Sequence, residues 1–326
     1  MLLLTKTVLS LMIGFLLATL LGLILIPLLK KLNVKQRLSI YMEEAHRKKS
    51  GTPTMGGLIF LIPTFLTTII LTLMGKIEMT TNLIIILFVL VGYSIIGFLD
   101  DYLIIKRHNN KGLTEVQKLF GQLVMAIIFF FIFMKTGGQT SLVISTLGIN
   151  IELGWLYGVF ILFALIAGSN AVNITDGLDG LAGGLSAIAC IAFGLISFSA
   201  GFEDIGIFCF ILCGALFGFL VFNIHPARIF MGDTGSLALG AVLVSIAILI
   251  RRELTLIVVM GVFIIETLSV ILQVIWLFAF KKRLFLMTPL HHHFEKLGWS
   301  EVDIVKLFWV FGLILSMAGI FFGVWL

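Results

Sequence analysis

Uninterrupted apolar runs of about 18 residues or more recur along this chain up to its last residue. A run of that length crosses the hydrocarbon core of a membrane as a helix, whereas a transmembrane strand would be shorter and would alternate polar with apolar residues. Composition agrees, because 60% of the 326 residues are hydrophobic, 12% are charged and the mean hydropathy is +1.17. These values leave too little polar surface for a water-soluble globule. The sequence therefore predicts an all-α integral membrane protein and disfavours a β-barrel.

The polar breaks between the runs predict a polytopic bundle of about ten transmembrane helices, forming one domain over residues 1–326. The expected spans are 9–29, 55–74, 82–99, 119–135, 153–170, 180–199, 206–222, 235–250, 255–277 and 304–325. No small-residue cleavage site stands out after the first run, so we expect an N-terminal anchor rather than a removed signal peptide. All three cysteines fall within spans and are expected to be buried as small apolar residues.

Lysine and arginine are distributed unequally between the two faces of this bundle. With the N-terminus outside, the loops after odd-numbered spans and their flanks hold seventeen of the 22 basic residues, and the opposite face holds five. Because basic loops stay in the cytoplasm, both termini are expected to be extracytoplasmic. Topology and anionic ligands then account for the net charge of +5, and nucleic acid is not needed as a partner.

Polar residues gather on the same basic face, in loops such as "HRKKSGTPTMGG" and "NAVNITDGLDGLAGG". A transporter should instead carry ionisable groups near the mid-plane, where this chain has chiefly Glu266 and Gln273. The asymmetry favours an active site in the cytoplasmic loops over transport. A lipid carrier or ion-coupled transporter that uses Glu266 in a relay is the alternative of a different class.

Two adjacent aspartates, Asp100 and Asp101, end the third apolar run in "GFLDDY". Carboxylates at a helix C-terminus oppose the helix dipole, so a purely structural role is unfavourable there. A carboxylate pair at the membrane interface suits a poised base or a magnesium ion, which takes carboxylate and phosphate oxygens. We expect the side chain of Asp100 to be solvated and to contribute little to stability.

Two glycine-flanked segments, "NITDGLDGLAGG" and "FMGDTGS", have the pattern of helix starts that face the cytoplasm. Asn173, Asp176 and Asp179 recur every three residues in the first segment, and Asp233 lies in the second. Free N–H groups at a helix start attract phosphate, and an aspartate there can also cap the helix. The pattern leaves both roles open for these aspartates.

Three consecutive histidines, His291, His292 and His293, stand in "TPLHHHFE". Consecutive residues of a regular element cannot all point at one ion, which favours hydrogen bonding to phosphate over a metal site. A solvated loop is the alternative without function. In "LTEVQK", Thr114 and Gln117 have the spacing of a capping box.

The segments "HRKKSGTPTMGG", "GFLDDY", "NITDGLDGLAGG", "FMGDTGSLALG" and "TPLHHHFE" together resemble the phospho-N-acetylmuramoyl-pentapeptide transferases (MraY), which are polyprenyl-phosphate sugar-1-phosphate transferases. The resemblance covers about residues 30–300. It implies that undecaprenyl phosphate attacks UDP-N-acetylmuramoyl-pentapeptide with Mg2+ as cofactor, releasing UMP and forming lipid I. A related N-acetylglucosamine-1-phosphate transferase would share the aspartate motifs and is the nearer alternative. Monomer or homodimer, and one-step or covalent two-step transfer, stay open.

The same resemblance implies roles for individual residues. Those expected to be catalytic are Asp100, Asp101, Lys118, Asp233, His291 and His292, with Asp233 also the metal ligand. Those expected to bind substrate are Lys49, Thr54, Asn173, Asp176, Asp179, Asn223, Phe230, Gln273 and His293. The family also has a basic residue soon after the aspartate pair, which cannot be assigned among Lys106, Arg107, His108 and Lys111.

Overall fold

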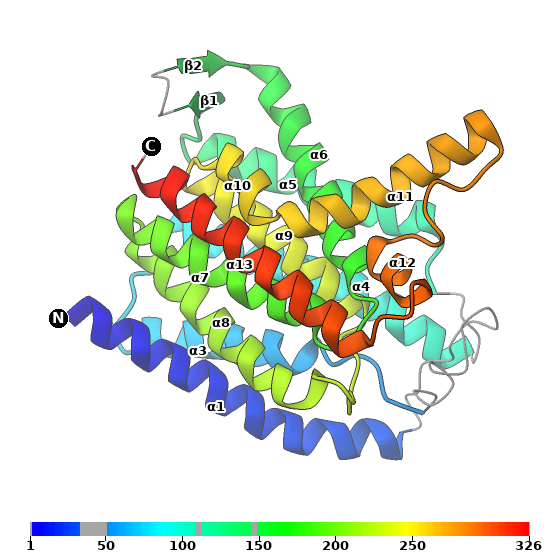
Figure 1. Cartoon of the computed structure of the whole chain (residues 1–326). Helices are drawn as coiled ribbons and strands as arrows, with labels where there is room; N and C mark the ends of the chain where they lie inside the picture. The colour runs from blue at the N-terminus through cyan, green and yellow to red at the C-terminus, as the bar shows by residue number, and fades with distance from the viewer. Residues whose placement is uncertain (1, 33–50, 108–111, 145–148, 326) are drawn as a thin grey trace.

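The structure is a computed structural model that describes residues 2–32, 51–107, 112–144 and 149–325. Its long helices lie side by side in one bundle (Figure 1). The helices are α1 (Leu2–Lys31), α3 (Leu58–Leu73), α4 (Thr81–Arg107), α5 (Glu115–Lys135), α6 (Trp155–Thr175), α7 (Leu181–Ser199), α8 (Glu203–Asn223), α9 (Asp233–Leu249), α10 (Glu253–Val259), α11 (Gly261–Phe280), α12 (Leu290–Lys296) and α13 (Glu301–Trp325). Two short strands, β1 (Ser141–Ile144) and β2 (Ile149–Glu152), pair antiparallel.

Each of the ten predicted spans is occupied by helix, and the ninth is shared by α10 and α11. Eight helices are long and apolar enough to cross a membrane, within the part of the chain that is described. Two shorter apolar helices, α3 with 16 residues and α9 with 17, complete the set. The predicted all-α polytopic fold class is therefore confirmed.

The ninth predicted span, 255–277, is not one helix. The chain bends at Met260, whose backbone angles (φ −88°, ψ 15°) leave the α-helical range, and α10 ends there before α11 begins. Hydrogen bonds continue across the bend, from Met260 N to Leu256 O (2.8 Å) and from Ile264 N to Met260 O (3.0 Å). Because hydropathy does not change at this position, the apolar pattern carries no sign of the bend.

The third predicted span, 82–99, is too short. Helix α4 continues for two further turns to Arg107, so Asp100 and Asp101 lie inside a helix and not at its end. Lys106 and Arg107 occupy the last turn, where positive charge is favourable to the helix dipole. Both aspartates are only 4% exposed, which contradicts the expectation that Asp100 is solvated.

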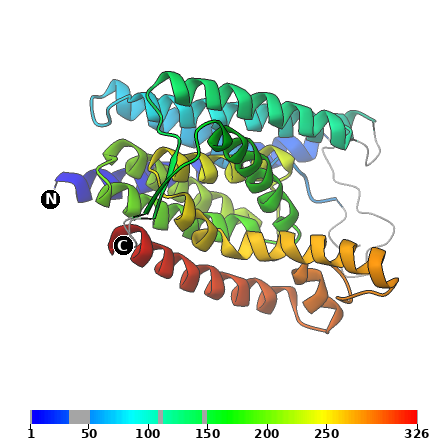
Figure 2. The same cartoon turned by 90° about the horizontal axis from the view of Figure 1, so that it is seen from above.

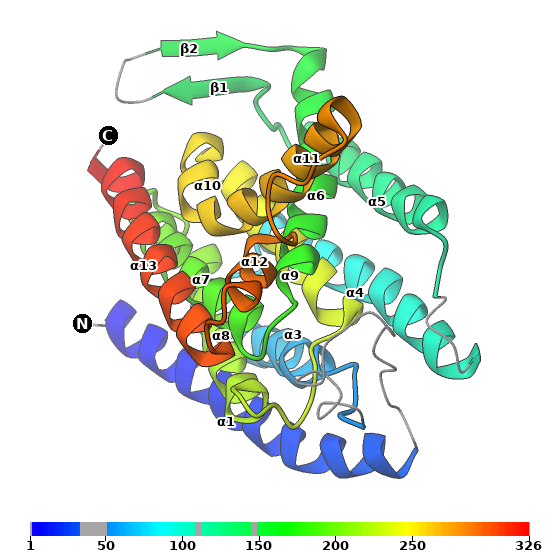
Figure 3. The same ribbon diagram turned by 45° about the vertical axis from the view of Figure 1, so that its right-hand side comes forward.

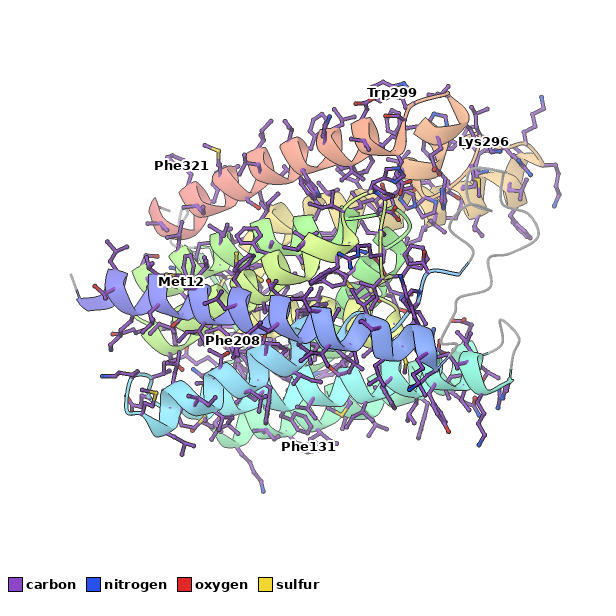
Figure 4. The ribbon with its side chains drawn as sticks, turned by 90° about the horizontal axis from the view of Figure 1, so that it is seen from below. Met12, Phe131, Phe208, Lys296, Trp299 and Phe321 are labelled. Carbon is purple, nitrogen blue, oxygen red and sulfur yellow. The ribbon has the colours of Figure 1, made fainter. Side chains whose placement is uncertain are left out.

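Helices α7, α8 and α9 form the centre of the bundle, and α1, α5, α11 and α13 form its outer surface. The most apolar stretch of α8 is 83% buried, whereas that of α1 is 28% buried. Figure 4 shows the contrast at single residues, because Phe208 of α8 lies inside while Met12, Phe131 and Phe321 project outward. All three cysteines are buried and free, as predicted. Because α9 lies at the centre, its first residues can contact several other helices.

Both chain ends lie at one end of the bundle, and α12 lies at the other (Figures 1 and 2). Figure 3 shows α12 between α11 and α13, and it contacts both of them. The histidine segment is thus a short helix docked on the bundle and not a solvated loop. The β1–β2 hairpin, between α5 and α6, was not predicted because its four-residue strands are too short for a clear period.

Candidate active site

Three aspartates from two helices meet at the start of α9. One carboxylate oxygen each from Asp100, Asp101 and Asp233 lies within 4.8 Å of the other two. Gly97 allows this approach, because a Cβ at that position of α4 would overlap the backbone of Asp233. The sequence predicted the three residues, and the packing of α4 on α9 brings them together.

Asp101 caps α9 from a different helix. Its Oδ2 accepts hydrogen bonds from the backbone N (3.0 Å) and the Oγ1 (2.6 Å) of Thr234, and its Oδ1 accepts from the Asp233 N–H at 3.3 Å. The residue at the N-cap position is Gly232, which has no side chain to do this (φ +73°). The alternative in which Asp233 caps its own helix is therefore wrong. Asp233 occupies the first position of α9, and its carboxylate has other partners.

Lys118 brings an ammonium group to this cluster from the first turn of α5. Its Nζ lies 2.6 Å from Oδ2 of Asp233 and 3.7 Å from Oδ1 of Asp100. The predicted capping box of Thr114 and Gln117 is present, so the start of α5 is firmly defined. Asp100 also accepts a hydrogen bond from the Leu113 N–H at 2.8 Å, which ties the segment before α5 to α4.

The last turn of α6 contributes the next polar group. Nδ2 of Asn173 donates to Oδ1 of Asp233 (2.8 Å) and to Oγ of Ser236 (2.9 Å), so both oxygens of Asp233 have partners. Asp176 follows at the C-cap of α6, partly buried. Removal from water and then the negative charges of Asp233, Asp101 and Asp179 raise the pKa of Asp176 well above its ordinary value.

These carboxylates fit a divalent cation. Magnesium prefers carboxylate oxygens, and the side chain of Asp233 is the most exposed of the three at 20%, against 6% for Asp100. The oxygens of Asp101 are taken by α9, which makes it the least available ligand. Asp233 with Asp100 is the pair best placed to hold an ion.

The loop between α6 and α7 is held by other segments and does not cap α7. The N-cap of α7 is Gly180, whose side chain makes no cap, so the expected capping by Asp176 or Asp179 is wrong. The backbone N–H of Asp179 donates to Oε1 of Glu301 (2.7 Å), and its Oδ2 accepts from the Ala227 N–H (3.1 Å). Nδ1 of His225 lies 3.0 Å from the same Oδ2. Asp179 therefore joins the starts of α7 and α13 to the segment after α8.

Asn223, expected to bind substrate, is 3% exposed and uses its amide within the protein. Its Oδ1 accepts from the Gly180 N–H (3.0 Å) and its Nδ2 donates to Ile229 O (2.9 Å). Thr54 and Phe230 lie on two backbone segments that run together, with Phe230 N bonded to Pro53 O at 2.9 Å. The hydroxyl of Thr54 faces Gly232, because a Cβ there would lie 2.7 Å from it.

The three histidines point at three different partners. Nδ1 of His291 lies 3.2 Å from Oε2 of Glu266, Nδ1 of His292 lies 2.5 Å from Oε2 of Glu295, and Nδ1 of His293 accepts from the Leu286 N–H at 3.1 Å. This agrees with the prediction that they do not share one metal ion. His291 is fully buried, and burial lowers the pKa of its imidazole in spite of the glutamate beside it.

Gln273 and His293 are among the predicted site residues that have no described contact with the aspartate cluster. Oε1 of Gln273 accepts from the backbone N–H groups of Leu284 and Phe285, and so it closes the segment after α11. His293 contacts the same segment. Lys49 lies outside the described residues, as do His108 and Lys111.

Several residues at the site were not singled out from the sequence. Thr234 and Ser236 stand within "FMGDTGS", so hydroxyl groups next to Asp233 were a signal that could have been used. His225 and Glu301 have no such signal, because they are 76 positions apart and meet only through packing. Nδ1 of His225 lies 3.1 Å from Oε2 of Glu301.

Residues 83–251 match the family model described as glycosyl transferase family 4, so the fold and this match define a multi-pass membrane protein of that class. Residues 49–61 match signature 1 of phospho-N-acetylmuramoyl-pentapeptide-transferase. The chain is 48% identical to the protein of that name from Bacillus licheniformis, 47% to that from Bacillus subtilis and 46% to that from Geobacillus thermodenitrificans. Each comparison covers 97–98% of this chain and 98% of the relative. The chain belongs to the phospho-N-acetylmuramoyl-pentapeptide-transferase family.

Proposed function

We propose that this protein transfers phospho-N-acetylmuramoyl-pentapeptide from its UDP derivative to undecaprenyl phosphate, releasing UMP and forming lipid I in peptidoglycan synthesis. The observation that carries the proposal is the near full-length similarity to proteins named for this transfer. The grouping of Asp100, Asp233 and Lys118 at the end of apolar helices suits the chemistry, because one substrate is a lipid and the other a water-soluble nucleotide.

The reaction we propose is a direct displacement at phosphorus. A phosphate oxygen of undecaprenyl phosphate attacks the β-phosphorus of the UDP-sugar, and the bond from that phosphorus to the oxygen bridging to UMP breaks. The second pKa of a phosphomonoester is about 6, so the attacking phosphate is mostly dianionic at neutral pH. Asp100 would take the remaining proton where one is present, and Lys118 would stabilise charge on the diphosphate.

Magnesium is part of the proposal. Asp233 would hold it with Asp100, and Asn173 would keep the Asp233 carboxylate in place. When bound, the ion would supply positive charge against the diphosphate oxygens. Lys118 lies beside these two carboxylates, and its ammonium group would also stabilise the diphosphate oxygens.

We further propose that the site faces the cytoplasm of a bacterial cell, with both termini outside. The supporting observations are the basic loops, the common position of the two chain ends in Figure 1, and the opposite position of α12. The loop holding Asp176 and Asp179 would bind the nucleotide, because it stands beside the metal-binding aspartates. Thr54 and Phe230 would line the same region.

The test is turnover by purified protein in detergent, with UDP-N-acetylmuramoyl-pentapeptide, undecaprenyl phosphate and magnesium, and with UMP release as the measurement. Detergent micelles hold no membrane gradient, so turnover would exclude a gradient-driven carrier. Use of UDP-N-acetylglucosamine instead would show the nearer alternative to be correct. Release of UMP without undecaprenyl phosphate, one equivalent per protein, would replace direct displacement by a covalent phospho-aspartyl route.

A further inference from the structure

Glu266 lies on α11, inside a membrane-spanning segment, with a fully buried side chain. A buried carboxyl group is costly unless hydrogen bonds compensate it, and one within a membrane span is usually functional. Both partners come from one residue: Oε1 accepts from the backbone N–H of His291 and Oε2 lies next to its Nδ1, each at 3.2 Å. Glu266 therefore fixes both the start of α12 and the ring of His291.

The other ring nitrogen of His291 points at the loop between α6 and α7. Nε2 is buried and has no hydrogen-bond partner among the described residues. A Cβ added to Gly177 would overlap this nitrogen and would lie 3.0 Å from the ring carbon Cε1. Gly177 directly follows Asp176 and stands two positions before Asp179. The imidazole thus packs edge-on against the backbone that carries both aspartates.

The end of this loop, at Asp179 and Gly180, has its own anchors. Glu301 holds the Asp179 N–H, and Asn223 holds the Gly180 N–H. The ring of His291, on α12, packs against Gly177 of the same loop. Loss of this packing would free Gly177 and the adjoining backbone of Asp176, whereas Asp179 and Gly180 would keep their anchors. The part of the loop that carries Asp176 therefore depends on Glu266 through His291.

We propose that Glu266 is a positioning residue for nucleotide binding: it holds His291 with the proton on Nδ1, and the ring in turn sets the loop 176–180. This inference rests on the proposed function of that loop as the UDP-sugar pocket. A neutral imidazole has one donor and one acceptor nitrogen, so a carboxyl acceptor at Nδ1 leaves Nε2 with a lone pair. In this state Nε2 can only accept a hydrogen bond, so it cannot donate one to a diphosphate oxygen. His291 thereby acts on the loop and through it on the nucleotide.

Glu266→Gln tests this, because it keeps the size of the side chain and removes the carboxylate. We expect the KM for UDP-N-acetylmuramoyl-pentapeptide to rise about tenfold or more, with the KM for undecaprenyl phosphate unchanged. In 15N-histidine NMR, the His291 signal is identified as the one that is missing from the spectrum of His291→Gln. This signal should show a protonated Nδ1 in the wild type and a protonated Nε2 in Glu266→Gln. The double variant Glu266→Gln/His291→Gln should have the same KM as His291→Gln alone, since the two act in series.

Glu253→Gln is the matched control. Glu253, the first residue of α10, is also a buried carboxyl (3% exposed), but its partner is the hydroxyl of Tyr157. This variant can lose stability and should keep both the KM and the tautomer. If Glu266→Gln does not fold, Gly177→Ala disturbs the same contact from the loop and should raise the same KM.

A Glu266→Gln or Gly177→Ala protein with the wild-type KM would overturn the inference, as would Glu266→Gln with an unchanged tautomer. Failure of the proposed function would look different. Wild-type protein would then release no UMP, although the NMR measurement, which needs no turnover, could still show the Nδ1–H tautomer.

Discussion

Asp100 and Asp101 are neighbours in the chain with separate surroundings. Successive residues of a helix point about 100° apart, which directs Asp101 at the start of α9 and Asp100 at Lys118. One carboxylate is used to position α9, and the other stands beside a cation. Asp101 thus has a structural role, and Asp100 is the one placed for chemistry.

This division predicts different outcomes for the two aspartates. Asp100→Asn should lower UMP release about 100-fold or more and change thermal stability little, because an amide can still accept from the Leu113 N–H. Asp101→Ala should also lower the free energy of unfolding, by about 1–3 kcal/mol, because the N–H and hydroxyl of Thr234 lose their acceptor. Thermal unfolding in detergent, measured beside turnover, separates the two; equal stability losses would contradict the assignment.

Asp233→Asn should lower activity without unfolding the protein. Asp233 does not cap α9, and an asparagine oxygen can still accept from Nδ2 of Asn173. Loss of the ionic ligand should reduce turnover about 100-fold, and excess magnesium should restore only part of it. The measurement is UMP release against magnesium concentration. Near-normal turnover with unchanged magnesium dependence would place the ion elsewhere.

In the protein without metal, ionisation of Asp176 should make the free energy of unfolding depend on pH. Its pKa is raised by burial and then by Asp233 and Asp101, so the folded protein binds the proton more tightly than the unfolded chain does. The stability that this provides is complete below the ordinary aspartate pKa of about 4 and is lost as pH rises through the folded-state value. Thermal unfolding with a chelator should show this loss, and Asp176→Asn should reduce it. Asp303→Asn, which removes an exposed carboxylate, should leave the pH dependence of stability unchanged.

At the scale of elements, the site depends on how closely α4 approaches α9. The approach is made at Gly97, where the backbone of Asp233 occupies the space of a side chain. The bend at Met260 acts at the same scale, because it begins the helix that carries Glu266 toward α12. Helix contacts, and not the helices alone, bring the carboxylates together.

Gly97→Ala should therefore separate the aspartates. The added methyl group meets backbone and cannot be accommodated by a side-chain rotation, so we expect a loss of about 1–3 kcal/mol in stability together with most of the activity. Gly92→Ala is the control on the same helix, because its methyl group would meet the flexible end of Met125. Thermal unfolding and UMP release test both variants. Full activity in Gly97→Ala would show that this close approach is not required.

At the scale of the whole molecule, the arrangement of ten spans brings the two termini to one end of the bundle and α12 to the other, as Figures 1 and 2 show. The central helices α7, α8 and α9 carry few charges, and the charged residues lie at the ends. An asymmetric catalyst of this kind needs one fixed orientation in the membrane.

Cysteine labelling in intact cells tests that orientation. The three native cysteines are buried, so background labelling should be low. A membrane-impermeant maleimide should label Lys76→Cys, in the exposed segment between α3 and α4, from outside. It should label Lys282→Cys, after α11, only once the cells are permeabilised. The reverse pattern would invert the proposed topology.

Sequence alone was sufficient for the class of fold and for most of the candidate residues. Apolar length determines the number of spans, because a helix must cover the hydrocarbon core whatever surrounds it. Local spacing determined the capping box at Thr114, and motif resemblance indicated the aspartates, Lys118 and the histidines. These patterns are short-range or shared by a whole family, so they predict residues and elements without knowledge of the tertiary structure.

Only the tertiary structure decided which of those residues cap, which hold one another and which stand ready for ligands. Asp101 caps a helix that starts 132 positions later, and Glu266 orients His291 across 25 positions. The bend at Met260 and the extension of α4 likewise follow from packing that hydropathy does not record. The physical reason is that buried polar groups must find partners, and the nearest partner in space is set by the contacts between helices and not by order along the chain.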